Sequence, residues 1–196
     1  MATANDLRNG VRAAYSDAAE HPDREHPFPI GRPFAESLGY PPNQLAKLPD
    51  ASIEAFAGVS NVAVTAEIPL GATVLDLGCG AGLDSLLAAA KTGALGRVIG
   101  VDFSGPMLDR ARRSVSEAGL RNVGFREADA ERLPLDDASV DVALVNGILN
   151  LNPAREAILR ELARVVRPGG VVYAAELILR EPVRMPDVID EADWFS

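Results

Sequence analysis

The sequence predicts an α/β fold in which five parallel strands form a doubly wound sheet of order 3-2-1-4-5. Between residues 70 and 180, short apolar runs alternate with segments whose apolar residues recur at helical spacing. The links between them are short, which favours parallel strands joined by right-handed crossovers. In addition, residues 74–82 are typical of a buried strand that runs into a glycine-rich turn opening a helix. In sheets of this kind, ligands bind beyond the carboxyl ends of the strands at the point where the strand order reverses, here strands one and four.

The strands are expected, in order, at residues 73–77, 97–101, 123–127, 140–145 and 171–177. The first intervening helix begins near Leu83. Ser104 is expected to cap the next helix, which ends at Gly119 and whose buried stripe consists of Leu108, Ala111, Val115 and Ala118. Asn152-Pro153 is expected to start the last helix, with proline at its first position, and the Arg-Pro-Gly-Gly run at 167–170 is expected to end it.

Before the sheet, residues 1–69 are expected to form a cap of short helices and loops. A helix is expected at residues 6–20, a short helical piece at 44–48 within a proline-rich stretch, and one or two short helices within 52–67. Apolar residues such as Phe28, Leu38 and Tyr40 favour a cap that packs on the core. The chain is thus divided into the cap (1–69), the sheet domain (70–180) and a C-terminal tail (181–196).

Composition and charge limit the classes of partner. With 196 residues, 47% hydrophobic and 24% charged, the chain is expected to be one globular unit. Its net charge of −9 argues against a nucleic acid as partner, and Arg110, Arg112 and Arg113 are interpreted as a solvated helix face. Cys79, the only cysteine, excludes an intrachain disulfide and fits a reducing compartment. No apolar run is long enough to span a membrane, so we expect a cytoplasmic protein with no membrane partner.

The glycine-rich turn carries the strongest functional signal. Asp76 precedes Gly78, Gly80 and Gly82, which form a G-x-G-x-G pattern. A dinucleotide fingerprint, G-x-G-x-x-G/A, would need its third small residue at position 83, where this chain has leucine. A carboxylate beside the turn, with no Lys or Arg from 73 to 90, repels a pyrophosphate but suits the ammonium and sulfonium groups of S-adenosylmethionine.

A second carboxylate supports this interpretation. Asp102 ends the second strand, 20 residues after Gly82, at the place where α/β nucleotide-binding folds put an acid on the ribose hydroxyls. The alternative for Asp102 is a charge at the start of the helix that follows. Met107 lies off the buried stripe of that helix, which favours a contact with the cofactor over packing in the core.

Over about residues 70–179 the chain resembles class I S-adenosylmethionine-dependent methyltransferases, which have a Rossmann-like sheet. The motifs that carry the resemblance are residues 76–82 (DLGCGAG), 100–104 (GVDFS) with Met107, 128–130 (ADA) with 133–134 (LP), and 167–170 (RPGG). This family usually continues past strand five with a helix and an antiparallel pair of strands, whereas about 18 residues follow Ile178 here. We therefore expect a shortened C-terminus, with the strand-five edge covered by a second copy of the chain or another partner.

The resemblance also implies roles for individual residues. The turn wraps the methionine part of the cofactor and comprises Asp76, Gly78, Cys79, Gly80 and Gly82. Asp102, with Phe103 beside it, holds the ribose, and Met107 packs on the adenine ring. Asp129, followed by Ala130, takes the adenine amino group.

Within this family the chain resembles the arsenite methyltransferase group at residues 145–153, at residues 32–42 and at Tyr15. That group binds As(III) through cysteine thiolates in the leader, before strand one and after strand four. This chain has Gly147 at the last of these places and no cysteine at the others. Because soft As(III) needs thiolate ligands, we expect a small-molecule acceptor other than arsenite.

The sequence offers candidates for the catalytic residues but does not decide among them. The reaction is expected to be an in-line displacement at the sulfonium methyl, which needs a general base only if the acceptor arrives protonated. Tyr15 and Asn146 are the candidate catalytic residues, and Asn146 is also a candidate cofactor contact; the alternatives are a core aromatic and a turn former. His26 and Asn150 are further candidates for lining the acceptor pocket, and Glu176 for a base. Two histidines without cysteine or clustered acids predict no metal site.

Two other functions compete with methyl transfer. One is a protein that binds the cofactor without catalysis, as a pseudoenzyme or a regulatory partner, which the missing thiolates and the shortened C-terminus favour. The other is a nicotinamide-dependent oxidoreductase, against which Leu83 and Asp76 argue. Turnover and binding of NAD distinguish the three.

Overall fold

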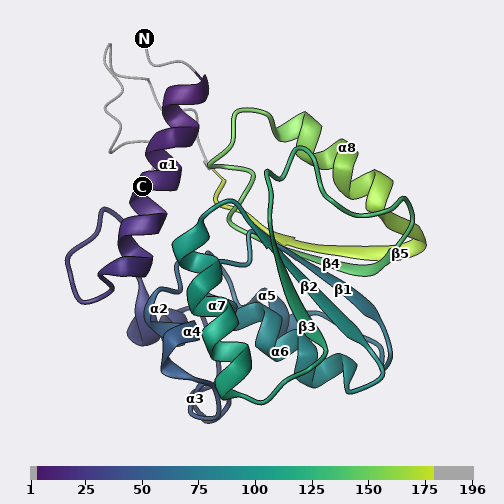
Figure 1. The fold of residues 1–196 in the computed structure, drawn as a ribbon, viewed down its shortest axis with the longest axis horizontal. Helices are drawn as coiled ribbons and strands as arrows, with labels where there is room; N and C mark the ends of the chain where they lie inside the picture. The colour runs from purple at the N-terminus through teal and green to yellow at the C-terminus, as the bar shows by residue number, and fades with distance from the viewer. Residues whose placement is uncertain (1–3, 179–196) are drawn as a thin grey trace.

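A computed structural model describes residues 4–178 of the chain, and at its centre lies a sheet of five parallel strands (Figure 1). The strands are β1 (Thr73–Leu77), β2 (Arg97–Asp102), β3 (Val123–Glu127), β4 (Val140–Asn146) and β5 (Val166–Ala175). Their order, β3-β2-β1-β4-β5, and their parallel pairing confirm the predicted topology. β1 and β3 have the predicted bounds. β2 and β4 each extend one residue further than predicted, so they end at Asp102 and Asn146, two residues predicted for the site.

The central strands β1, β2 and β4 are buried on both faces of the sheet, to which their successive side chains point alternately. Val74 of β1 packs in a cluster with α6 (Leu83–Thr92), whereas Leu75 and Leu77 pack in a cluster with α8 (Arg155–Val165). Figure 1 shows α8 on one side of the sheet and α6 on the other. α7 (Gly105–Glu117) runs beside β3. Helices on both faces make the fold doubly wound, as predicted.

The N-terminal cap packs against α6 and α7 and contributes to the core. Its helices are α1 (Ala4–Glu20), α2 (Gly31–Ser37), α3 (Pro42–Leu45), α4 (Asp50–Glu54) and α5 (Val62–Thr65). Tyr40, Leu45 and Ile53 of the cap are fully buried. α1 lies against α7, and α5 against α6 (Figure 1). The apolar residues of the cap therefore pack on the core, as their sequence pattern predicts.

Arg110 on α7 ties the cap together and corrects one expectation. Its guanidinium donates to the carbonyl oxygen of Ala19 at the end of α1 and to the carboxylate of Glu54 at 2.9 Å. Arg110 therefore does not belong to a solvated face, whereas Arg112 and Arg113 are exposed as predicted. A basic side chain bridges two helices here because their carbonyl and carboxylate oxygens converge on it.

The buried stripe of α7 also differs from the prediction. Ser104 caps the helix, and its hydroxyl accepts the N–H of Met107 at 3.4 Å, as expected. Leu108 and Ala111 are buried, but Ala118 is exposed and Ser114 takes its place in the interior. Ser114 can be buried because its hydroxyl donates to a backbone carbonyl one turn earlier, at 3.0 Å.

The segment between β4 and β5 differs from the prediction at both ends. α8 begins at Arg155 rather than at Pro153, because Oδ1 of Asn152 accepts the N–H of Ala154 at 2.7 Å and forms a turn ahead of the helix. β5 begins directly at Val166 and ends at Ala175, so that the Arg-Pro-Gly-Gly run lies inside the strand. Proline and glycine are tolerated there because β5 is an edge strand.

β5 leaves apolar side chains at the edge of the sheet. Val171 and Val172 are 45% and 41% exposed. The expected second copy or partner along this edge stays a prediction. The predicted tail, residues 181–196, lies outside the described residues. None of the helices between residues 4 and 178 combines the length and the apolar character needed to cross a membrane.

Gly100 in β2 gives a test of how closely β2 packs. A Cβ at this position would lie 2.5 Å from Cδ1 of Phe125 and 2.9 Å from Sγ of Cys79. We expect Gly100→Ala to lower the free energy of unfolding by about 1–3 kcal/mol, measured by denaturant unfolding. Gly124→Ala in the neighbouring β3, where nothing lies within 4 Å of the added Cβ, is the matched control and should change it by less than about 0.5 kcal/mol. Equal effects of the two substitutions would contradict the packing.

Candidate functional site

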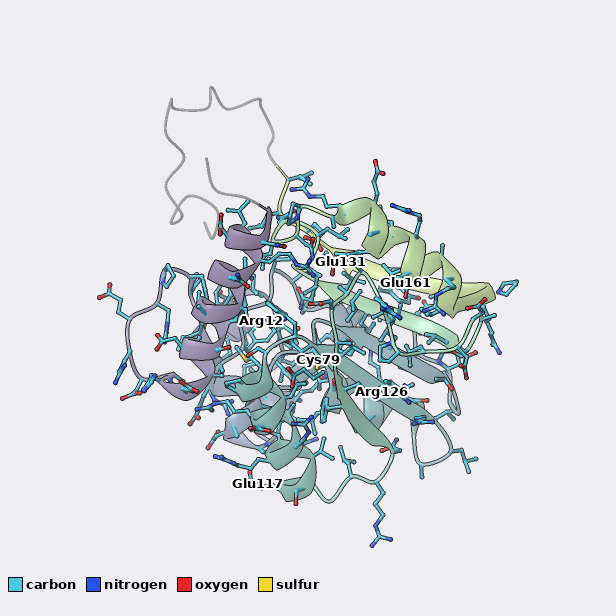
Figure 2. All side chains as sticks on the ribbon, turned by 45° about the horizontal axis from the view of Figure 1, so that its top comes forward. Arg12, Cys79, Glu117, Arg126, Glu131 and Glu161 are labelled. Atoms are coloured by element: carbon cyan, nitrogen blue, oxygen red, sulfur yellow. The ribbon has the colours of Figure 1, made fainter. Side chains whose placement is uncertain are left out.

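A cavity opens at the carboxyl ends of β1, β2 and β4, where the predicted topology places ligands. Its volume is about 1040 Å³ with its mouth included. Its walls come from the loop after β1, the ends of β2 and β4, the segment after β3, and parts of the cap that include α1. Figure 2 shows Cys79 of the loop near the centre of the molecule, with Arg12 of α1 and Glu131 around it in this view. The cavity therefore lies between the sheet domain and the cap.

The loop after β1 closes tightly because its glycines adopt backbone conformations that other residues avoid. Gly78 and Gly80 have φ angles of +71° and +49°, and a Cβ on Gly78 would overlap the side chain of Ile148 from the segment after β4. Gly82, which is the N-cap of α6, does not line the cavity. A Cβ on Gly82 would lie 3.1 Å from Cβ of Ala111, so this glycine allows the start of α6 to lie close to Ala111 of α7.

Two of the predicted acids reach the cavity as buried carboxyl groups. Asp76 is 2% exposed and accepts the hydroxyl of Ser85 at 2.5 Å. Burial, and next the nearby carboxyl group of Asp84, raises the pKa of Asp76 to about 8. Asp102 is 8% exposed, and its two oxygens accept two backbone N–H groups at 2.9 Å, one of them from Gly80. Burial raises the pKa of Asp102, and these hydrogen bonds oppose the rise.

A third buried carboxyl group, Asp84, is not among the residues that the sequence predicts for the site. It lies in the first turn of α6, lines the cavity and is 5% exposed. The hydroxyl of Tyr40 donates to it at 2.6 Å, and Nδ2 of Asn146 donates to it at 2.9 Å. Oδ1 of the same asparagine accepts the N–H groups of Val59 and Ser60. The one sequence signal for Asp84 is an acid two residues after the glycine pattern, in an otherwise apolar stretch.

Acidic side chains outnumber basic ones around the cavity. Its buried acids are Asp76, Asp84 and Asp102, and among the described residues Arg8 is the only basic side chain that lines it. Arg8 is itself paired with the carboxylate of Glu131 at 3.0 Å, so it adds no uncompensated positive charge. Such a cavity favours a cationic ligand over a phosphate.

The structure brings most of the predicted cofactor residues to this cavity: Asp76, Gly78, Cys79, Gly80, Asp102, Phe103, Met107, Asp129, Ala130 and Asn146. Met107 is 1% exposed and packs among alanines of the cap and the loop. Asp129 is half exposed and accepts from Arg8 and Arg12 of α1 at 3.3 and 3.4 Å. Arg12 also lies over the ring of Phe103, 5.2 Å from its centroid. Their roles toward a cofactor stay predictions.

Of the remaining candidates, Tyr15 lies at the cavity and His26 does not. Tyr15 stacks on Phe28 with 4.6 Å between ring centroids. Burial, followed by the carboxylates of Asp102 and Glu176, raises the pKa of Tyr15 above its usual range, so the phenol stays protonated. Nε2 of His26 lies 2.9 Å from a backbone carbonyl oxygen of its own loop. Within residues 4–178, no three His, Cys, Asp or Glu side chains are arranged to hold a metal ion.

Glu176, the candidate base, is engaged by backbone N–H groups outside the cavity. It follows β5, and its carboxylate accepts the N–H groups of Ile148 and Leu149 at 2.9 Å and of Asn150 at 3.3 Å. The side chain of Asn150 donates to the carbonyl of Leu177 at 2.8 Å. Neither Glu176 nor Asn150 lines the cavity. Both hold the backbone after β4 in place.

Comparison with known proteins places these features in context. Residues 70–190 match the family described as "Methyltransferase domain". An arsenite methyltransferase of Halobacterium salinarum is 38% identical over 148 residues, which cover 76% of this chain and 38% of that protein. A demethylmenaquinone methyltransferase of Lactococcus lactis is 36% identical over 106 residues, 54% of this chain and 42% of that protein. The chain thus matches about two fifths of the length of these relatives.

A solved structure is also similar to this chain. The arsenic(III) S-adenosylmethionine methyltransferase of Chlamydomonas reinhardtii has a TM-score of 0.53 and 30% sequence identity, and the match covers 72% of this chain and 48% of that one. The similarity therefore extends beyond the glycine turn to most of the described chain.

The buried carboxyl of Asp76 predicts a dependence of stability on pH. Because its pKa is higher in the folded chain (about 8) than its ordinary value of 3.8, the folded state binds the proton more tightly. The stability that Asp76 contributes is complete below about pH 4 and is lost as the pH rises through about 8. We expect Asp76→Asn to flatten this decline and to raise the free energy of unfolding by about 1–3 kcal/mol at high pH.

Denaturant unfolding of both proteins across this range measures the effect. Asp109→Asn, at an exposed acid on α7, is the control and should keep the slope of the unsubstituted chain. An unchanged slope in Asp76→Asn would contradict the prediction.

Proposed function

This chain belongs to the methyltransferase domain family, and from that premise we propose that it transfers the methyl group of S-adenosylmethionine to a small-molecule acceptor other than arsenite. The observation that carries the proposal is a cavity with three buried carboxyl groups beside a glycine turn. A site with several carboxyl groups and no uncompensated basic side chain suits the ammonium and sulfonium groups of the cofactor, because a cation favours the ionised form of these acids. The family supports the type of reaction by analogy, and the chemistry of the site supports the cofactor.

The residues present fit such a cofactor. Asp102 is proposed to hold the ribose hydroxyls, and Asp76, with the backbone of Gly78 and Gly80, the methionine part. When bound, S-adenosylmethionine supplies a methyl carbon that its sulfonium makes electrophilic. The chain's own contribution is to align the two reactants and exclude water, and alignment is worth up to ~7–11 kcal/mol in favourable systems. Tyr15, which stays protonated, can donate a hydrogen bond at the cavity but cannot serve as a base there.

Two features support an acceptor other than arsenite: the chain has a single thiol, and part of the cavity wall is apolar. Cys79 is the only cysteine of the chain. It is 7% exposed, and burial raises its pKa well above the ordinary value, which keeps it a thiol. As(III) needs thiolate ligands, and one buried thiol in the turn cannot supply them. Phe56, Ile148 and Leu151 add apolar surface to the cavity, which favours an uncharged acceptor.

Calorimetric titration with S-adenosylmethionine and S-adenosylhomocysteine tests the cofactor. We expect binding to weaken by about 10- to 100-fold in Asp102→Asn, because a charge-assisted hydrogen bond to a ribose hydroxyl becomes a neutral one. Asp109→Asn, the same change at an exposed acid of the following helix, should bind like the unsubstituted chain. NAD should not bind. No loss of affinity in Asp102→Asn would refute the assignment of this acid.

A screen with methyl-labelled S-adenosylmethionine tests the transfer. Arsenite with glutathione is expected to yield no methylated product, because the chain lacks the thiolates that would hold it. Uncharged small molecules with a nucleophilic nitrogen, oxygen or sulfur are expected to include an acceptor. Methylated arsenic would refute the exclusion of arsenite. Cofactor binding without transfer to any acceptor, including those in a cell lysate, would favour a non-catalytic, cofactor-binding protein instead.

A further inference from the structure

Asn146, the last residue of β4, uses both ends of its side-chain amide inside the protein. Oδ1 accepts the N–H groups of Val59 at 2.9 Å and Ser60 at 3.1 Å, and Nδ2 donates to the carbonyl oxygen of Ser60 at 2.8 Å. These bonds join residues far apart in the sequence, from the cap and from the sheet. One side chain thus docks this segment of the cap to the end of β4.

A buried pair fixes the orientation of that amide. Nδ2 of Asn146 also donates to Oδ2 of Asp84 at 2.9 Å, while Oδ1 of Asp84 accepts the hydroxyl of Tyr40 at 2.6 Å. Tyr40 is 1% exposed and Asp84 is 5% exposed, so these bonds form away from water and are correspondingly strong. Because the carboxylate of Asp84 only accepts, it requires the NH₂ end of the amide to face it. The oxygen of the amide is thereby directed at the cap.

The segment that Asn146 holds forms part of the cavity wall. Phe56, Ala57 and Gly58 line the cavity, and they directly precede the residues bonded to the amide. A Cβ on Gly58 would lie 2.6 Å from Nδ2 of Asn146 and 2.7 Å from Cζ of Phe56. The wall therefore rests directly on the amide, and it can be displaced from either side of this contact.

We propose that Asn146 is a positioning residue that sets the width of the cavity between the cap and β4 by holding residues 56–60 in place. It acts through this wall and does not contact the reacting groups. The inference rests on the proposed function, because it takes the cavity as the place where cofactor and acceptor meet.

Two substitutions reach the wall from opposite sides. Asn146→Ala removes the amide, whereas Gly58→Ala keeps the amide and displaces the wall, because the added Cβ overlaps both the amide and the ring of Phe56. The matched controls are Asn122→Ala, whose side chain donates to a loop carbonyl beyond α6, and Gly124→Ala, where the added Cβ meets open space. All are made in the full chain. The measurements are hydrogen exchange at the two amides bonded to Asn146 and the affinity for S-adenosylhomocysteine by calorimetry.

We expect both wall variants to accelerate exchange at Val59 and Ser60 by about tenfold or more, the effect of one lost hydrogen bond. Both should shift the affinity for S-adenosylhomocysteine in the same direction and by a similar factor, and the controls should change neither quantity. A loss of affinity in Asn146→Ala with full affinity in Gly58→Ala would mean that Asn146 touches the ligand directly, which overturns the positioning role. Unchanged exchange in both variants would overturn the docking of the segment.

Failure of the proposed function gives a separate result. If the unsubstituted chain binds neither S-adenosylmethionine nor S-adenosylhomocysteine, the proposed function fails. The exchange rates of the two amides then still decide whether Asn146 holds the wall.

Asn146→Asp is a milder variant with a signature in pH. The aspartate keeps the oxygen that accepts from Val59 and Ser60, but it places a second carboxyl group beside Asp84. The other titratable groups on the surrounding elements are Tyr40 in the cap, Asp76 on β1 and Glu176 after β5. A proton shared by the two carboxyls restores the missing donor. Exchange at the two amides, corrected for its intrinsic rate, should therefore slow toward that of the unsubstituted chain as the pH falls from about 8.5 to about 6. Protection independent of pH would contradict the role of Asp84.

Discussion

The burial of three carboxyl groups at one edge of the sheet is the constraint on which the surrounding structure depends. A carboxylate taken out of water is costly unless hydrogen-bond donors surround it. Asp102 obtains them from backbone N–H groups, one of which the glycine turn presents, and Asp76 obtains one from a serine of α6. Asp84 needs one donor from the cap and one from β4. The turn, the start of α6 and the attachment of the cap therefore answer the same need.

The same burial links ligand binding to the stability of the fold. Burial raises the pKa of each of the three acids, and at Asp76 repulsion by Asp84 and Asp102 adds to the rise. A ligand that brings positive charge relieves this repulsion, so it binds the folded chain and stabilises it at once. The cap is linked to these acids by hydrogen bonds. Tyr40 donates to Asp84. The N–H groups of Val59 and Ser60 donate to the amide of Asn146, which is itself bonded to Asp84.

Local sequence signals are sufficient for the order of the sheet and for most of its strand bounds, and they point to the turn and the strand ends that line the cavity. Apolar runs bounded by turn residues give β1 and β3 their bounds, and the spacing from the turn identifies Asp102. The sequence does not reveal the environment of Asp84, because its partners Tyr40 and Asn146 lie 44 and 62 residues away. The sequence allows Glu176 to be a base for the same reason, since the backbone groups that occupy its carboxylate lie 26 to 28 residues earlier. Periodicity describes a face of one element and contains no information on such contacts.

The way in which Glu176 holds the segment after β4 has a consequence for how such a site can evolve. Its carboxylate binds the main-chain N–H groups of residues 148–150, which every amino acid except proline possesses. The side chains of this segment can therefore be exchanged while its path stays anchored. Three side chains of the segment are nevertheless constrained. Ile148 contacts the turn, Leu149 packs against the core, and Asn150 donates to the carbonyl of Leu177. Leu151, which lines the cavity, is the position of this segment where a substitution changes the cavity wall while the path of the backbone stays anchored.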